Sequence, residues 1–299
     1  MVYSEEVDVL GAKIRIDVYS SKRVDCVFED NIWFDYRLGK SEIRRVATKS
    51  EPDIIWYKDT SLKNLVYNPT SETLTLFGEW FSGELQRLAV ALLLKELEKK
   101  NIFSFHATGF NDKGSNIMLL GGESNHGKTM TLIEALRRGA LMISGETILL
   151  DWDGNILAGS KEIFLKKRPK GTERSDLPGS EGWRKFFESL PEVKLKDYEG
   201  KGEKFNLVVL PDIDGNFDPE IKELGEFEKQ YQTFVSITLG YYMLPCLISS
   251  EIPMPIIDSY ERRIRRAQFV KRFSEDKKYY MIRGKDPKVV MDHIEEIIA

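Results

Sequence analysis

The sequence predicts an α/β protein with two parts, a β-rich N-terminal part over residues 1–80 and an α/β domain over residues 81–299. Three observations support this division. Lys13–Tyr19 alternates polar and apolar residues, which is typical of a half-buried strand. From Ser82 onward the apolar residues recur at helical spacing instead. A short apolar run, Asn116–Leu120, then leads directly into a glycine-rich loop and a helix, which is the order of elements in an α/β domain.

Within the N-terminal part, Thr73–Leu76 repeats the alternating strand pattern, and Asn68–Ser71 marks a turn between two strand-like runs. No group of residues in this part has the spacing of a catalytic site. A flanking β-rich domain is the simpler interpretation, and a role in recognising a substrate is the alternative.

The helix expected over Ser82–Lys100 carries Glu84 near its start and Lys99 near its end. Each has the charge that the helix dipole favours at that end. A strand over Ile102–Thr108 and a polar turn over Asn111–Ser115 are expected next, before the strand that leads into the glycine-rich loop.

Beyond the loop, expected strands and helices alternate, as they do in α/β domains. The segment 169–204 is rich in charge, Gly and Pro and is expected to form a loop, and Asp151–Gly154 is typical of a hairpin turn. The expected elements are a helix over Lys128–Arg138, a strand region over Leu141–Asp151, strands over Glu162–Leu165 and Leu207–Leu210, helices over Glu220–Leu247 and Asp258–Phe273, a strand over Lys278–Arg283 and a last helix over Pro287–Ile298.

The composition excludes several classes of protein. Hydrophobic residues make up 41% and charged residues 31%, and the net charge of −4 leaves no basic footprint for nucleic acid. The two cysteines, Cys26 and Cys246, do not form a metal-binding pattern, and a reducing compartment suits them. The apolar stretch Phe234–Ser249 is too short and too interrupted to span a bilayer. We therefore expect a cytoplasmic protein without a nucleic-acid or membrane partner.

Residues 122–129 match the pattern G-x-x-x-x-G-K-[ST] of a phosphate-binding P-loop, or Walker A motif. Its glycines let several N–H groups point into one concavity at a helix N-terminus, where partial positive charge favours phosphate. We expect Lys128 to reach the β- and γ-phosphates of a nucleoside triphosphate and the Thr129 hydroxyl to bind Mg²⁺. The candidate nucleotide-binding residues are Gly122, Glu123, Ser124, Asn125, His126, Gly127, Lys128, Thr129 and Met130.

The residues around this loop resemble the core of the HPr kinase family, which is related in fold to phosphoenolpyruvate carboxykinases. The resemblance rests on Phe105–Phe110, on Ile117–Thr129 and on the helix that ends in Leu136–Ala140. It covers residues 80–168, extends weakly to the last strand and helix, and includes almost nothing of the N-terminal part. It implies a P-loop-containing mixed-sheet domain of the HPr kinase and phosphoenolpyruvate carboxykinase type.

The resemblance also implies an activity, the transfer of the γ-phosphate of ATP or GTP to a hydroxyl group of a small molecule or peptide. In that reaction His106 would lie near the γ-phosphate and the incoming hydroxyl. The family has two adjacent aspartates that fall here on Gly145 and Glu146, so one acid is lost and the other is lengthened. His106 and Glu146 are the candidate catalytic residues, and Thr129 and Glu146 are the candidate Mg²⁺ ligands. The HPr protein is not the expected acceptor, since the family's glycine-rich segment after the acidic pair is absent.

Two other functions fit the same residues. A nucleotide-binding sensor without phosphoryl transfer is favoured by the missing acid at Gly145. An NTPase that hydrolyses nucleotide is the other, with Asp212 at a strand end as its acidic residue. Arg168 could contact a phosphate or an acidic substrate, or belong to a solvated basic face. Family members form closed oligomers, which implies a homo-oligomer. The sequence identifies neither the acceptor nor the preferred base of the nucleotide.

Overall fold

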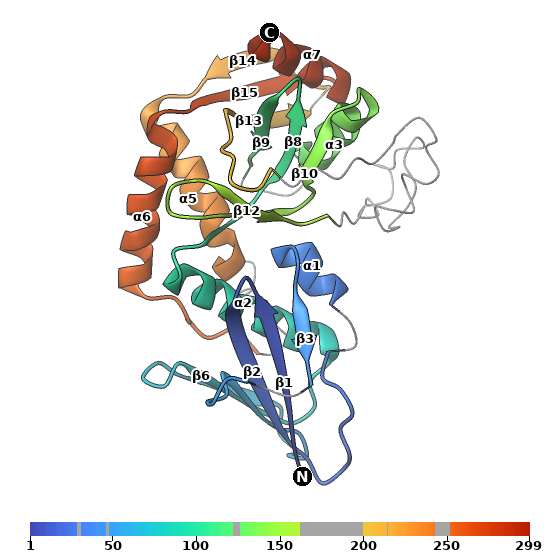
Figure 1. Ribbon diagram of the computed structural model, residues 1–299, viewed down its shortest axis with the longest axis vertical. Coiled ribbons are helices and arrows are strands. Elements are labelled where there is room, and N and C mark those ends of the chain that lie inside the picture. The colour runs from blue at the N-terminus through green and yellow to red at the C-terminus, as the bar shows by residue number, and fades with distance from the viewer. Residues whose placement is uncertain (29–30, 46–47, 122–125, 162–199, 214, 243–251) are drawn as a thin grey trace.

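The computed structural model describes residues 1–28, 31–45, 48–121, 126–161, 200–213, 215–242 and 252–299, and its architecture is mixed α/β (Figure 1). The described helices are α1 (Ile32–Leu38), α2 (Ser82–Lys99), α3 (Lys128–Arg137), α5 (Glu226–Tyr242), α6 (Tyr260–Glu275) and α7 (Pro287–Ile298). The described strands are β1 (Val2–Val9), β2 (Ala12–Tyr19), β3 (Glu42–Arg44), β4 (Ile54–Tyr57), β5 (Asn64–Asn68), β6 (Thr73–Phe77), β7 (Phe103–His106), β8 (Thr108–Asp112), β9 (Ser115–Leu119), β10 (Leu141–Ser144), β11 (Thr147–Leu150), β12 (Ile156–Gly159), β13 (Leu207–Ile213), β14 (Glu220–Glu223) and β15 (Lys278–Gly284).

The N-terminal strands form one mixed sheet in the order β3-β1-β2-β4-β6-β5, and α2 covers one face of it (Figure 1). The alternation expected for β2 is confirmed, because Ile14 and Ile16 are buried and lie in one core with Leu88 and Leu92 of α2. The expected strand over Thr73–Leu76 and the helix from Ser82 are confirmed as β6 and α2. The side chains of α2 therefore complete the core of the preceding sheet.

The second mixed sheet, in the order β10-β8-β9-β13-β15-β14, lies in the other half of the molecule (Figure 1). Successive residues of β9 point to opposite faces, as strand geometry requires. Ile117 and Leu119 pack in one core with the apolar side chains of α3 and α7. Met118 packs on the other face, in a core shared with α5, α6 and the small sheet β12-β11-β7. The sheet is thus covered on both faces, which suits its short parallel strands β9, β13 and β15.

The strand region expected over Leu141–Asp151 is confirmed, but it is divided into two strands. The structure has two strands there, β10 in the second sheet and β11 in the small sheet, and Gly145 and Glu146 form the connection between them. The Gly145 N–H donates to the Ser160 carbonyl at 2.8 Å, which fixes this change of direction. Periodicity cannot detect such a break, because both strands are apolar and buried.

The C-terminal third differs from expectation at two points. The helix expected from Glu220 begins only at Glu226, since Glu220–Glu223 forms the edge strand β14 beside β15. The strand expected to end at Leu210 continues through Pro211 to Ile213, paired in parallel with β15. The expected last strand and last helix are confirmed as β15 and α7.

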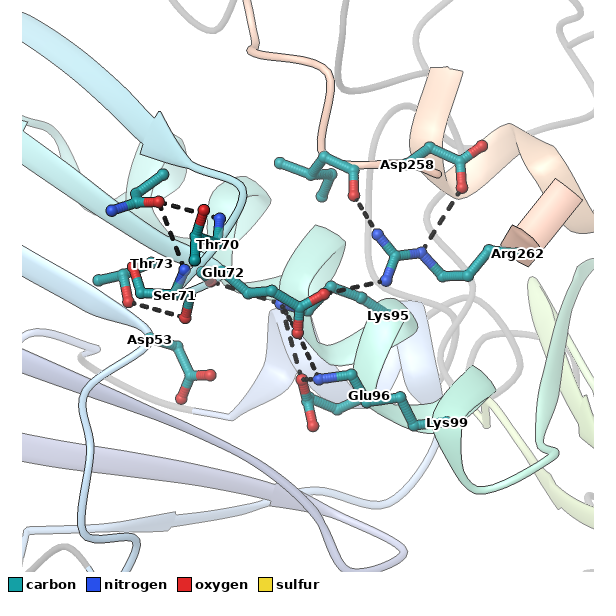
Figure 2. A network of polar contacts seen from close by, with 12 residues as sticks. Asp53, Thr70, Ser71, Glu72, Thr73, Lys95, Glu96, Lys99, Asp258 and Arg262 are labelled. Carbon is teal, nitrogen blue, oxygen red and sulfur yellow. Dashed lines mark hydrogen bonds and ion pairs between the residues drawn. The ribbon is translucent and has the colours of Figure 1, made fainter. Parts of the chain in front are cut away.

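A network of charged side chains joins the two halves of the molecule (Figure 2). Glu72, in the turn between β5 and β6, accepts from Lys99 of α2 at 2.6 Å and from Arg262 of α6 at 3.2 Å. The Lys95 ammonium lies 3.2 Å from the same carboxylate, and its side chain is fully buried. The Glu72 carboxylate therefore connects the N-terminal sheet to α2, which packs on that sheet, and to α6 of the second half. Among the helices described, none is both long and apolar enough to cross a membrane.

Candidate functional site

The frame of the candidate site is the connection from β9 to α3. β9 runs parallel to β13, and beyond its end the Leu120 N–H donates to the Val209 carbonyl at 2.8 Å. The helix α3 begins at Lys128, directly after the loop. The carboxyl end of a parallel strand facing a helix N-terminus is a favourable place for an anion. The expected phosphate-contacting residues 122–125 lie outside the described residues.

Gly127 occupies a position that only glycine can fill. Its φ angle is 104°, in the left-handed region that L side chains rarely adopt. A Cβ atom there would also lie 2.6 Å from Cγ1 and Cδ1 of Ile213. The Ile213 N–H donates to the His126 carbonyl at 3.3 Å, so the loop rests on the end of β13. The second glycine of the P-loop pattern thus allows the loop to approach the neighbouring strand.

The first turn of α3 carries the other candidate residues. Lys128 is buried, and its ammonium donates to the Gly121 carbonyl at 3.1 Å, so that it lies across the start of the loop. Thr129 and Met130 follow it on α3 and are half-buried, whereas His126 before the helix is exposed. The structure therefore places Lys128 and Thr129 at the helix N-terminus, where the P-loop pattern predicts them.

His106 and Glu146 lie side by side at the edge of the small sheet. β7 and β11 pair antiparallel, and the Ala107 N–H donates to the Glu146 carbonyl at 3.1 Å. The His106 Nε2 lies 3.3 Å from the Glu146 Oε1. A carboxylate can only accept, so Nε2 carries the proton in this contact. The His106 Nδ1 is buried and finds no hydrogen-bond partner among the residues described. The two candidate catalytic residues, one at the end of β7 and one in the connection between β10 and β11, are thus brought together.

The site also contains residues that the sequence analysis missed. The Arg37 guanidinium, from α1 in the N-terminal part, lies 3.2 Å from the same Glu146 oxygen that His106 approaches. The buried Tyr36 is also hydrogen-bonded to the Glu146 side chain. A weak signal for this helix exists, because Phe34 and Leu38 are both buried at i, i+4 spacing. Seven residues are too few for such a pattern to stand out in a segment read as strands.

The electrostatics of Glu146 follow from these contacts. Burial raises the pKa of its carboxyl, but the hydrogen bond and charge of His106 and the charges of Arg37 and Lys128 outweigh that effect. They hold the pKa at about 2. Glu146 is therefore ionised at neutral pH and is a weak base. Lys128 contributes to this shift, so the lysine of the loop and the pair His106–Glu146 belong to one electrostatic site.

The alternative acidic residue, Asp212, has a partner of its own. It lies on β13 beside Arg283 of β15, and the Arg283 Nε donates to its carboxylate at 2.8 Å. The Arg283 guanidinium also packs 5.1 Å from the ring centre of Phe217. Arg168 and the basic stretch around it fall outside the described residues, so the structure does not bear on their expected role.

The oxygen-bearing side chains at the site would suit a magnesium ion if one arrived with a nucleotide. In the part of the chain that the structure describes, no group of three or more His, Cys, Asp or Glu could hold a metal by itself. Mg²⁺ usually takes only one or two protein oxygens and completes its shell with phosphates and water. The Thr129 hydroxyl and the ionised Glu146 carboxylate are oxygen donors of that kind.

Comparison with known proteins adds no further constraint, since no protein-family model matches the chain and no curated protein is significantly similar to it. Any function assigned to the chain therefore rests on its residue pattern and on the geometry of the site.

Proposed function

We propose that the chain is an ATP- or GTP-dependent phosphotransferase of the HPr kinase-like type, with the corresponding P-loop fold in its second half. It transfers the γ-phosphate to a hydroxyl group of a small molecule or a peptide. The observation that carries the proposal is the position of Lys128, which starts α3 at the end of the loop that follows the buried strand β9 and contributes to the low pKa of Glu146.

The proposed roles follow from the chemistry of each side chain. Lys128 and the loop amides hold the β- and γ-phosphates, since they place positive charge and N–H donors at a helix N-terminus. Thr129 and Glu146 hold Mg²⁺, which when bound would neutralise charge on the phosphates. Catalysis in this class of reaction consists mostly of positioning and charge stabilisation, which these groups provide.

The role of orienting or deprotonating the acceptor hydroxyl is assigned to His106 rather than to Glu146. A carboxylate with a pKa of about 2 is a poor base at neutral pH, so Glu146 orients the imidazole and binds cations instead. The Nε2 of His106 faces Glu146 at 3.3 Å, as in other sites where a carboxylate fixes the orientation of a histidine.

One observation favours a second function, a nucleotide-binding sensor without phosphoryl transfer. Gly145 stands where the related kinases have an acid, and the remaining acid, Glu146, already contacts Arg37, His106 and Tyr36. A carboxylate engaged in this way suits binding more than proton transfer.

The test incubates the protein with γ-labelled ATP and Mg²⁺, with and without a small-molecule extract of the source cells. It measures where the labelled phosphate goes. Wild type is compared with Lys128→Ala, Glu146→Gln and the control Lys113→Ala, which removes an exposed lysine paired with Glu295. For a kinase, we expect label to move onto a component of the extract. Lys128→Ala and Glu146→Gln should each reduce the rate at least about a hundredfold, and the control should leave it unchanged.

Each outcome separates the candidates. Free phosphate released equally with and without extract indicates an NTPase. Nucleotide binding that Lys128→Ala removes, without turnover in the small-molecule extract or with a peptide library, rejects the kinase in favour of the sensor. Equal binding of nucleotide by wild type and Lys128→Ala would contradict all three functions, because each depends on the phosphate loop.

A further inference from the structure

A cavity of about 420 Å³ lies at the opposite end of the strands from the candidate site. It is lined by the turn after β11, by Lys204–Asn206 before β13, and by the chain from the end of α6 to Lys277, which directly precedes β15. β9, β13 and β15 run parallel, so the residues before β13 and β15 lie at the amino ends of these strands. The phosphate loop follows the carboxyl end of β9. The cavity is therefore a separate site.

Aromatic side chains from three segments of the chain line this cavity, namely Trp152, Phe205 and Phe273. Phe205 and Phe273 are buried, and the half-buried Trp152 packs on Phe103 with the ring centres 5.8 Å apart. A Cβ atom at Gly154 would lie 3.4 Å from the Phe273 ring, so the turn after β11 lies close against α6. Packed aromatic walls of this kind suit a ligand that carries a planar ring.

Three cations and two carboxylates line the same cavity. Arg272 is paired with Asp153. The ammonium groups of Lys204 and Lys277 then face one remaining carboxylate, that of Asp276. A ligand with one negative charge would balance these side chains, whereas a doubly charged phosphate would exceed them. The charges therefore favour a carboxylate as the anionic group of a ligand.

The two lysines repel each other in the absence of a ligand. Burial, and next the charge of Lys204, lower the pKa of Lys277 from 10.5 to about 8, and the attraction of Asp276 is a smaller effect. Lys277 is still mostly protonated at pH 7. Its ammonium donates to the Phe273 carbonyl at 2.9 Å, and within the described part of the chain the Lys204 ammonium forms no hydrogen bond or ion pair. Because an ammonium has three donors, both lysines can donate to a ligand.

We propose that this cavity binds a small aromatic carboxylate, at a site separate from that of the proposed phosphotransfer. The ring of the ligand lies against Trp152, Phe205 and Phe273. Its carboxylate lies between the ammonium groups of Lys204 and Lys277 and relieves their repulsion. The binding does not depend on a nucleotide.

The test is calorimetric titration of the whole chain with three probes. Benzoate carries both the ring and the charge, benzamide has the same ring and shape without the charge, and acetate has the charge without the ring. We expect benzoate to bind at least about fivefold more tightly than either of the others. Lys204→Met and Lys277→Met should each weaken benzoate binding about fivefold and change benzamide binding less than about twofold. The matched control is Lys271→Met, which removes an exposed lysine of α6 outside the cavity and should match wild type.

Other results overturn the inference. Equal affinity for benzoate and benzamide means that the lysines do not contact the ligand, and no binding of benzoate at about 10 mM means that the cavity does not take this class of ligand. Unchanged affinity in both lysine variants places the ligand elsewhere. An equal loss in Lys271→Met shows a general effect of surface charge. Thermal unfolding of each variant checks folding, and if Lys277→Met does not fold, the exposed Lys204→Met decides by the same ratio of affinities.

Discussion

Among single residues, Glu146 has the most unusual surroundings in the candidate site. It contacts the donors His106 of β7 and Arg37 of α1, and the charge of Lys128 on α3 acts on it as well. Their combined effect is a pKa of about 2, below the ordinary value of 4.5. Such a carboxyl remains ionised through the whole physiological range, which suits a group that holds cations in place.

This shift predicts how stability depends on pH. Because the folded pKa is lower than the unfolded one, the unfolded chain binds the proton first, and the stabilisation present above pH 4.5 is lost as the pH falls towards 2. The full contribution is about 3 kcal/mol, and roughly half of it is lost by pH 3. Urea denaturation of wild type and Glu146→Gln between pH 7 and pH 3 measures it. We expect the difference in unfolding free energy between them to shrink by about 1–2 kcal/mol over that range.

Parallel pH curves for the two proteins would contradict the low pKa of Glu146. The comparison with Glu146→Gln is needed because other carboxyls also titrate in this range. The pKa of Glu72, for example, is raised by its partial burial but held at about 2 by the hydrogen bonds and charges of Lys99, Lys95 and Arg262. The contribution of Glu72 is the same in both proteins and cancels in the difference.

At the level of secondary structure, the junction of the loop with α3 depends on Gly127 and its contact with β13. Gly139, just beyond the other end of α3, has nearly the same backbone, with φ 96° against 104°. The surroundings differ, because a Cβ at Gly139 would meet nothing within 4 Å and one at Gly127 would overlap Ile213. Substitution of Gly139 therefore tests backbone strain alone, and substitution of Gly127 tests backbone strain together with the overlap with Ile213.

We expect Gly139→Ala to lower the unfolding free energy by about 1–2 kcal/mol, the cost of an L residue in the left-handed region. Gly127→Ala should cost roughly a further 1–3 kcal/mol from the overlap and should also abolish nucleotide binding. Urea denaturation and calorimetry with a nucleotide measure the two effects. Equal losses of stability in both variants would show that the contact with Ile213 is unimportant.

For the molecule as a whole, charged groups inside the fold connect its halves. Besides the Glu72 network of Figure 2, the fully buried Arg266 of α6 donates to Glu98 of α2 at 3.0 Å and also reaches Asp258. Burial raises the pKa of Glu98 to about 7, against the opposing charge of Arg266. The ionised form of Glu98 therefore depends on this arginine, which joins α2 of the N-terminal core to the helix layer of the second half.

Removing one partner of the Arg266–Glu98 pair should lower the unfolding free energy far more than removing both partners. Arg266→Met preserves apolar volume but leaves Glu98 buried without its cation, and we expect a loss of about 3–5 kcal/mol at pH 8. Adding Glu98→Gln should restore a large part of it, because the uncompensated charge is gone. A double-mutant cycle by urea denaturation measures the coupling. Additive losses would mean that the pair does not hold the halves together.

Local patterns of residues were sufficient to predict several elements of the fold. Alternation at Lys13–Tyr19 and helical spacing from Ser82 predicted β2 and α2, because each period reflects one buried face of one element. The phosphate-loop pattern predicted a helix beginning at Lys128, and the structure has that helix. The resemblance singled out His106 and Glu146, and the structure brings their side chains together.

Features that depend on packing between distant segments could not be predicted from local patterns. The run Leu141–Asp151 divides between two sheets, and the Gly145 N–H at the division donates to the distant Ser160 carbonyl, a contact that periodicity cannot predict. Arg37 enters the candidate site because α1 packs in the N-terminal core with its arginine directed at Glu146. Local pattern records which face of an element is buried. Which residues pack against that face depends on how distant segments of the chain fold together. Here the packing of α1 brings Arg37 to the Glu146 carboxylate.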